Sequence, residues 1–207
     1  MKIRIMILTG LAICTLFGAC GKSNETAKAE ANDKTSSNTA QTENTWYYDW
    51  DKGMEAAKKE NKPAYVHFTA DWCTWCKKMR KETYAATEIS NRFKDGWITI
   101  SIDTEDNNKT GKVYLDEKAK KALSYLQGEK GDFEEKTLTN SQLMQFFGGS
   151  GLPTLLFIDK EGIPLQKIPG FIEKEEFAVI LDFFKEEAYK KNISFEDFKK
   201  SHKGMGN

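Results

Sequence analysis

The sequence predicts an α/β fold in which helices flank a central mixed sheet, and three features indicate this fold. Residues 64–70 are rich in aromatic and β-branched residues, as in a buried strand, and good helix formers follow at 77–82. Residues 97–103 alternate and are β-branched, which indicates a second strand. Pro153 opens an apolar strand, and a turn, a second short strand and a charged amphipathic helix follow it.

Length and charge set the first limits. A chain of 207 residues has room for one domain with appendages, and we expect that domain over residues 45–207. Aromatic residues make up 12% of the chain, which suffices for a packed core. The chain has 31 basic and 31 acidic side chains, and this balance predicts no nucleic-acid partner.

The first 19 residues predict export. A basic start precedes an apolar run that is too short to span a membrane and is typical of a secretory signal. Cys20, directly after Gly18 and Ala19, resembles the lipidated cysteine of bacterial lipoproteins, which becomes the new N-terminus. We therefore expect a signal peptide over residues 1–19 and a lipid anchor at Cys20, in the periplasm or elsewhere in a bacterial cell envelope. Plain secretion with cleavage near Ala19 is the alternative.

A tether is expected between this anchor and the domain. Residues 20–44 contain no aromatic residue and cannot bury enough apolar surface to fold, which predicts a flexible linker. Residues 46–50 then begin the folded part, as a short strand or an aromatic clamp. A helix is predicted over 51–60 with Ala56 and Ala57 facing inward, and Pro63 ends it before the strand at 64–70. A further helix with a break is expected over 83–93.

Two cysteines stand where the strand at 64–70 leads into the next helix. Cys73 would lie at the helix N-terminus, where free N–H groups and the helix dipole favour a reactive thiolate. Cys76, one turn later, can form a disulfide with Cys73 and release whatever Cys73 has captured. The other two cysteines fall inside the signal and at the proposed anchor. An inert local disulfide is the alternative, but so small a loop adds little stability.

Two motifs carry a resemblance to the thioredoxin superfamily over residues 45–191. They are Asp71-Trp72-Cys73-Thr74-Trp75-Cys76-Lys77 and Gly151-Leu152-Pro153-Thr154. Their surroundings are similar to secreted thioredoxin-like domains and to the terminal periplasmic domain of DsbD-type thiol reductases. The resemblance implies a thioredoxin-like fold, a cis bond before Pro153 beside the cysteines, and thiol–disulfide exchange, with reduction favoured. It also implies a protein substrate with a disulfide and an upstream thiol electron donor.

Further site residues follow from these motifs. Leu152, Pro153 and Thr154 are expected to bind an incoming peptide strand. Trp72 and Trp75 are both candidate substrate contacts: we expect Trp72 mainly to pack on the edge of the core and Trp75 to be partly exposed. Both rings covering the core is the alternative.

His67 stands where many thioredoxins carry a buried aspartate, six residues before Cys73. It could transfer the proton of the resolving cysteine, because the pKa of histidine lies near neutrality. A hydrogen-bonded strand histidine without a redox role is the alternative.

Neither a metal nor a cofactor is expected. A closed zinc site needs four ligands, and the sequence has no second CxxC and no HxxxH motif. The two histidines, His67 and His202, are far apart in the sequence. A non-enzymatic binding module or a metallochaperone on the same scaffold is the alternative function.

Residues 104–150 are longer than the connection in a plain thioredoxin, and we expect a helical insertion there. A loop is predicted at 106–111, a helix at 112–127, a turn at 128–132 and a helix at 141–147 before the proline. The buried stripe of the first helix would comprise Val113, Leu115, Ala119, Ala122, Leu123 and Leu126. The insertion could form a wall near Cys73 or a peripheral elaboration, and both stay open.

A closing helix is predicted over residues 173–191. Its inner side would carry Phe177, Ile180, Leu181 and Phe184. Residues 193–200 are expected to add a turn or a short helix, and the tail from His202 is expected to fray.

Overall fold

The computed structural model describes residues 46–114, 116–127 and 136–202. The predicted signal, tether, 128–132 turn and last five residues lie outside the described residues. Five strands form the central sheet in the order β1-β3-β2-β6-β7, with β1, β3 and β2 parallel and β6 and β7 antiparallel. Their bounds are β1 (Trp46–Tyr47), β2 (Ala64–Thr69), β3 (Ile98–Asp103), β6 (Thr154–Ile158) and β7 (Pro164–Pro169). The predicted mixed sheet is confirmed.

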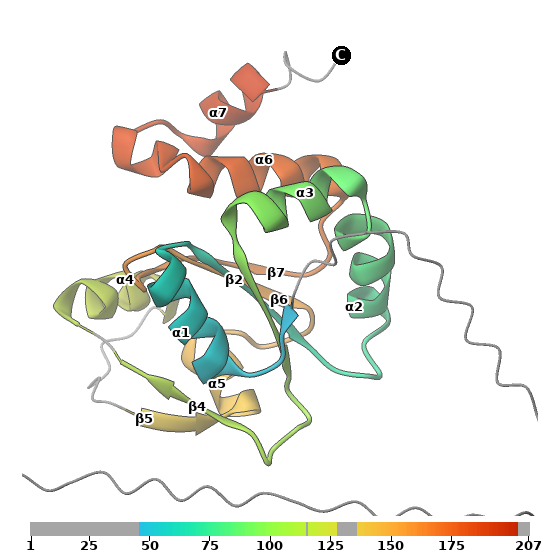
Figure 1. Ribbon diagram of the computed structural model, residues 1–207, viewed down its shortest axis with the longest axis vertical. Helices are drawn as coiled ribbons and strands as arrows, with labels where there is room; N and C mark the ends of the chain where they lie inside the picture. Colours follow the sequence, from blue (N-terminus) through green and yellow to red (C-terminus); the bar gives the residue numbers. More distant parts are fainter. Residues whose placement is uncertain (1–45, 115, 128–135, 203–207) are drawn as a thin grey trace, which may run out of the picture. The chain divides into compact units, whose positions relative to one another are not determined.

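Helices cover both faces of this sheet (Figure 1). They are α1 (Trp50–Glu60), α2 (Thr74–Lys78), the π-helical η1 (Met79–Tyr84), α3 (Thr87–Gly96), α4 (Glu117–Gln127), α5 (Asn140–Phe146), α6 (Lys174–Lys185), the 3-10 helix η2 (Ala188–Lys191) and α7 (Phe195–His202). The predicted helices at 51–60, 83–93, 141–147 and 193–200 are each present within a few residues.

The two faces of the sheet bury different side chains, because successive strand residues point to opposite sides. The face toward α1 and α5, here called the α1 face, takes Val66 and Phe68 of β2 and is mainly aliphatic. The face toward α3 and α6, here called the α6 face, takes Tyr65 of β2. Aromatic rings dominate this second face: Tyr65 lies 5.2 Å from Phe157 and 5.2 Å from Phe177, measured between ring centroids.

The insertion differs from the helix predicted over 112–127. Residues Thr110–Val113 form β4, which pairs antiparallel with β5 (Lys136–Thr139), and α4 begins only at Glu117. Two contacts fix β4 on α1: the Trp50 Nε1–H donates to the Lys112 carbonyl (2.9 Å), and the Lys112 N–H donates to Asp51 Oδ1 (2.7 Å). Backbone pairing with a distant segment therefore replaces the first helical turns.

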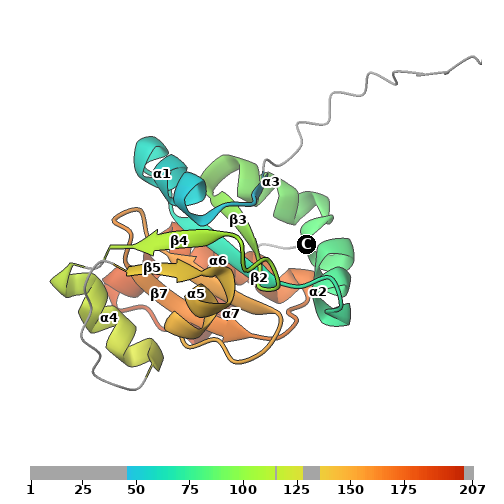
Figure 2. The ribbon, with the colours of Figure 1, turned by 90° about the horizontal axis from the view of Figure 1, so that it is seen from below.

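The position of α4 bears on the two alternatives for the insertion. In both Figure 1 and Figure 2, α4 and α2 lie at opposite sides of the domain. Ala119 and Leu123 of α4 are buried, and Leu123 joins the α1-face core. The helix of the insertion is therefore peripheral to Cys73, whereas Asp106 and Lys109 of its first loop line a pocket that Asp71 also lines.

The closing helix also ends earlier than predicted. The helix α6 stops at Lys185, and Glu187 takes a left-handed conformation (φ 52°) before the single turn of η2. Phe177 and Leu181 face the α6-face core as expected, while Phe183 packs against α7. Among the described helices, none has the length and apolar character needed to cross a membrane.

Candidate active site

The cysteine pair lies where the sequence places it, between β2 and α2. The Cys73 N–H donates to the Ala70 carbonyl (3.1 Å), which closes the turn after the strand. Cys73 is the N-cap of α2, and the Cys76 N–H donates to the Cys73 sulfur (3.1 Å). The two residues form a disulfide with their Cα atoms 5.3 Å apart. The same N–H would stabilise a Cys73 thiolate once the bond is reduced.

Both cysteine side chains are buried. The exposed fraction of Cys73 is 3% and that of Cys76 is 0%, so neither sulfur is open to solvent in the oxidised state. In this state the Cys73 sulfur is bonded to the fully buried Cys76 at the first turn of the helix. Cys73 is the N-cap residue and Cys76 lies within α2, and the role of Cys73 as the attacking group stays a prediction.

The proline loop lies at the same end of the sheet. The Leu152–Pro153 peptide bond is cis, as the resemblance implied. Thr154 begins β6 directly opposite Phe68, one residue from the end of β2. The strands run antiparallel, so the loop before β6 and the cysteine loop after β2 share one edge. The Gly170 N–H donates to the Pro153 carbonyl (2.8 Å) and ties β7 to this loop.

The residues next to the proline have different surroundings. Thr154 is 1% exposed, and its hydroxyl donates to the Gly151 carbonyl (2.6 Å), so its side chain supports the loop from inside. Leu152 is half-buried against the α1-face core. Within the described residues, its backbone N–H and C=O have no protein partner, which leaves them available to an extended peptide.

Both tryptophans beside the cysteines are exposed. Trp72 is 66% exposed, which corrects the expectation that it packs on the core, and Trp75 is 55% exposed, as expected. Trp75 lies 5.8 Å from the Phe171 ring, and the Lys78 ammonium lies 4.4 Å from the centre of that ring. Sequence reasoning missed Phe171 as a site residue, because only the fold brings the residue after Gly170 next to α2.

His67 lies deep in the fold, on the side of β2 that faces η1. Its exposed fraction is 1%, and its ring stands edge-on to Tyr84 with 5.3 Å between centroids. Burial, together with the positive charge of Arg80, lowers the pKa of His67 to about 3. The imidazole is therefore neutral at physiological pH and is a weak base. The alternative of a hydrogen-bonded histidine does not hold for Nε2, which has no partner.

The described part of the chain contains no group of three or more histidine, cysteine and acidic side chains arranged to hold a metal ion. His67 and His202 come from β2 and from the end of α7. The cysteine sulfurs are bonded to each other in this state and offer no thiolate to a metal.

Comparisons with known proteins agree with this geometry. A family model described as a thioredoxin-like domain matches residues 50–185. That stretch contains both cysteines, the cis-proline loop and the whole insertion.

The curated relatives include two bacterial thiol proteins. The chain is 26% identical over 132 residues to the thiol:disulfide interchange protein DsbD of Pseudoalteromonas atlantica, covering 63% of this chain and 17% of that protein. It is 26% identical over 121 residues to the disulfide bond reductase DsbH of Chlamydia pneumoniae, covering 58% and 59%. It is also 30% identical over 70 residues to spermatogenesis-associated protein 20 of Rattus norvegicus, covering 34% and 9%. The chain thus spans only a small part of two of these relatives.

Among solved structures, a thioredoxin-fold protein from Helicobacter pylori superposes with a TM-score of 0.51 at 19% identity, covering 70% of this chain and 82% of that one. This similarity supports the fold alone.

Proposed function

The chain belongs to the thioredoxin-like domain family, and we propose that it reduces protein disulfides through Cys73 and Cys76. The observation that carries the proposal is the Cys73–Cys76 pair, with Cys73 at the N-cap of α2 and the cis-proline loop at the same sheet edge. Of the curated relatives, the thiol:disulfide interchange protein supports disulfide exchange, and the disulfide bond reductase supports the reducing direction.

The reaction proceeds in two exchange steps. In the reduced protein, the Cys73 thiolate attacks one sulfur of the substrate disulfide; a mixed disulfide forms and the other substrate sulfur leaves as a thiolate. The Cys76 thiolate then attacks the Cys73 sulfur, which forms the intramolecular disulfide and releases the second substrate thiolate. Two electrons pass to the substrate. A thiol donor restores Cys73 and Cys76 by the same exchange in reverse.

Substrate binding would use the surface around the disulfide. The unpaired backbone groups of Leu152 can pair with an extended peptide, and Pro153 holds this loop in its cis form. Trp75 offers an exposed ring and Phe171 a half-buried ring beside it to the flanking substrate side chains, and Trp72 adds a third ring. Thr154 acts on the substrate only indirectly, by supporting the loop.

We also propose that the protein is exported and held to a membrane by a lipid on Cys20, with residues 20–44 as the tether. The sequence of residues 1–20 supports this. A Cys20→Ala variant should be released from the membrane fraction. Membrane association that survives this substitution would contradict the anchor and leave the exchange chemistry untouched.

The exchange proposal is tested by insulin reduction with a dithiol donor. Cys73→Ser should abolish turnover and form no mixed disulfide. Cys76→Ser should also lose turnover but accumulate a covalent complex with the substrate that a reductant dissolves, because the resolving sulfur is absent. Turnover unaffected by either substitution would contradict the proposal and favour a non-enzymatic binding module.

A further inference from the structure

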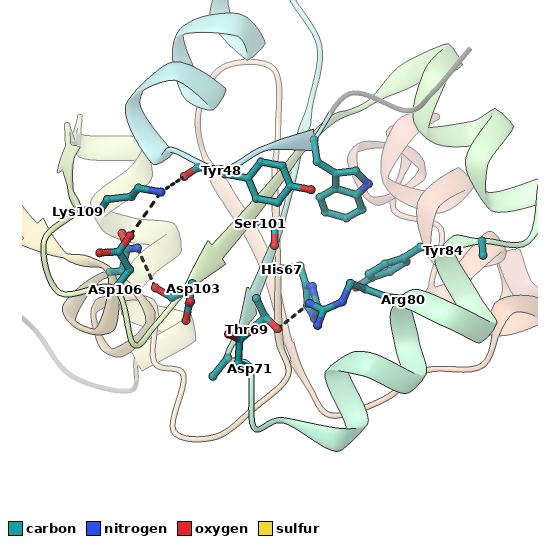
Figure 3. Close-up of a pocket in the computed structure, with 14 residues that line it drawn as sticks. Tyr48, His67, Thr69, Asp71, Arg80, Tyr84, Ser101, Asp103, Asp106 and Lys109 are labelled. Carbon is teal, nitrogen blue, oxygen red and sulfur yellow. Dashed lines mark hydrogen bonds and ion pairs between the residues drawn. The ribbon is translucent and has the colours of Figure 1, made fainter. Parts of the chain in front are cut away.

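A second candidate site lies beside the cysteine loop, in a pocket of about 660 Å³ at the carboxyl ends of β2 and β3 (Figure 3). Ala70 and Asp71 form part of its wall, so the segment that leads to Cys73 runs along the pocket, although neither cysteine lines it. Small-molecule sites in proteins have volumes of roughly 300–1,000 Å³. The pocket therefore has the size of a small ligand.

One side of this pocket carries an uncompensated cation. Arg80, from η1, donates one hydrogen bond from Nη1 to Thr69 Oγ1 (3.0 Å). Within the described residues it forms no ion pair with any carboxylate. A guanidinium has five N–H donors in a planar fork, and a carboxylate accepts two of them side by side. Arg80 is thus available to a carboxylate in the pocket.

His67 forms the inner wall on this same side. It is 1% exposed, and its Nε2 atom has no hydrogen-bond partner in the protein. A buried polar atom without a partner costs free energy, and a polar ligand that reaches it removes that cost. Figure 3 shows His67 and Arg80 side by side, next to Thr69. In the tautomer with the proton on Nε2, the neutral imidazole donates to an oxygen, so both side chains can bind the same carboxylate.

The other side of the pocket is acidic. Lys109 and Asp106 lie 3.5 Å apart and neutralise each other. Asp103 has no cationic partner within the described residues, and the Glu105 N–H donates to only one of its oxygens (3.0 Å). Asp71, on the cysteine loop, also lacks an ion pair in the described part of the chain. Figure 3 shows Asp103 across the pocket from Arg80.

We propose that this pocket binds a free α-amino acid, with its carboxylate on Arg80 and His67 and its ammonium group on Asp103 and Asp71. A ligand with only a negative charge would face two unpaired carboxylates, and a ligand with only a positive charge would face Arg80. A zwitterion matches both ends. The first loop of the insertion supplies Asp106 and Lys109 to the rim, which gives this segment a role in ligand binding.

The test is calorimetric titration of the full chain with single free amino acids, starting with glycine, L-alanine and L-glutamine. At least one should bind saturably with a Kd near or below ~1 mM, which corresponds to about −4 kcal/mol. Acetate and ethylammonium, which each carry only one of the two charges, should bind at least tenfold more weakly. The absence of saturable binding by all three zwitterions, or acetate binding as tightly as they do, would overturn the proposal.

Variants assign the binding to this pocket. Arg80→Gln should weaken the Kd roughly 10- to 100-fold, because a charge-assisted pair is lost. Lys81→Gln removes one neighbouring exposed positive charge that does not line the pocket, and it should bind like the unmodified chain. Equal affinity in Arg80→Gln and Lys81→Gln would contradict the assignment.

Two further readouts separate this site from the disulfide. The chain has two histidines, so ¹⁵N-histidine labelling gives separate signals for His67 and His202. The ligand should shift the His67 ring nitrogens and leave those of His202 unchanged, and the opposite result would overturn the placement. A Cys73→Ser/Cys76→Ser double variant should retain the Kd, because neither sulfur lines the pocket. Exchange activity can therefore fail without affecting this result, and the reverse also holds.

Discussion

The two faces of β2 carry different side chains at the carboxyl end of the strand, where the cysteine loop begins. On the α1 face, Ala64, Val66 and Phe68 are all buried and apolar, so this face of β2 is apolar up to its last residue. On the α6 face, the strand starts with the apolar ring of Tyr65 but continues with His67 and ends with Thr69. One face is thus filled by core packing along its whole length, whereas the other changes from core to polar pocket beside the cysteine loop.

This difference shows how one strand serves stability and chemistry together. The side-chain period of two keeps the functional residues apart from the aliphatic core, so polar groups accumulate on one face only. This arrangement costs free energy on the α6 face, where the buried neutral His67 has a ring nitrogen without a hydrogen-bond partner.

The largest effect is expected from truncating neighbours on β6 that point to opposite faces. Phe157 lies on the α6 face among four aromatic rings, and Leu156 lies on the α1 face; both are fully buried. Phe157→Ala should cost about 4 kcal/mol and Leu156→Ala about 3 kcal/mol, because the larger side chain leaves the larger cavity. Urea unfolding measures both. A greater loss of unfolding free energy in Leu156→Ala would contradict the expectation that the aromatic α6 face contributes more to stability at this point of β6.

The next effect depends on pH and belongs to the α6 face. The folded-state pKa of His67, about 3, lies below its ordinary value of 6.5. Between these values the unfolded chain binds the proton more readily than the folded chain does. The contribution of His67 to stability is therefore fully present above pH 6.5 and is lost as the pH falls toward 3. The slope should approach ~1.4 kcal/mol per pH unit.

The control for this prediction is His67→Phe, whose stability should fall less steeply over the same pH range. The difference between the two proteins cancels other titrating groups. One of these is Asp159, whose pKa burial raises to about 6 and whose contribution has the opposite sign. Parallel pH profiles of the two proteins would show that His67 is not buried neutral.

A third effect concerns the hydroxyl pair on the α6 face. The Tyr65 and Tyr84 hydroxyl groups lie 2.5 Å apart, and both rings are buried. Tyr84→Phe should cost about 1–2 kcal/mol, because it leaves the Tyr65 hydroxyl buried without this partner. The Tyr65→Phe/Tyr84→Phe double variant should cost less than the sum of the single changes. Additive costs in this cycle would mean that the two hydroxyl groups do not interact.

Two segments show which parts of the fold could be predicted from the sequence and which could not. The strand, cysteine pair and helix over residues 64–84 could be predicted, because the apolar run, the motif and the helix formers are local signals. The pairing of Thr110–Val113 with Lys136–Thr139 could not, because the paired residues are 23 (Val113 and Lys136) to 29 (Thr110 and Thr139) positions apart in the sequence. The hydrogen bond from Trp50 Nε1 that holds β4 is also non-local.

For the same reason, the sequence predicts some residues of the two candidate sites and not others. Cys73 and Cys76 stand between a strand pattern and a run of helix formers, which places them, and the resemblance to the thioredoxin superfamily implies the place of Pro153. The exposure of Trp72 depends on what the fold leaves uncovered, which no neighbouring residue indicates. Arg80 reaches the pocket only because η1 packs beside β2, so a sequence with several basic residues at 77–81 gives no reason to single it out.

The smallest change in stability is expected for the exposed rings. Trp75→Ala should alter the free energy of unfolding by less than about 0.5 kcal/mol, because the ring is mostly in solvent. It should nevertheless lower turnover of insulin several-fold and leave reduction of a small aromatic disulfide unchanged, because only a protein substrate reaches the Trp75–Phe171 surface. The matched control is Tyr114→Ala, which is similarly exposed on the insertion. Equal loss in both variants would contradict a substrate role for Trp75.

The reduction potential of the Cys73/Cys76 couple, measured against a glutathione buffer, tests the proposed reductase most directly. A reductase requires a potential near that of thioredoxin, about −270 mV, and we expect the value to fall there. A potential near that of DsbA, about −120 mV, would make the protein an oxidant and contradict the proposed direction of electron flow.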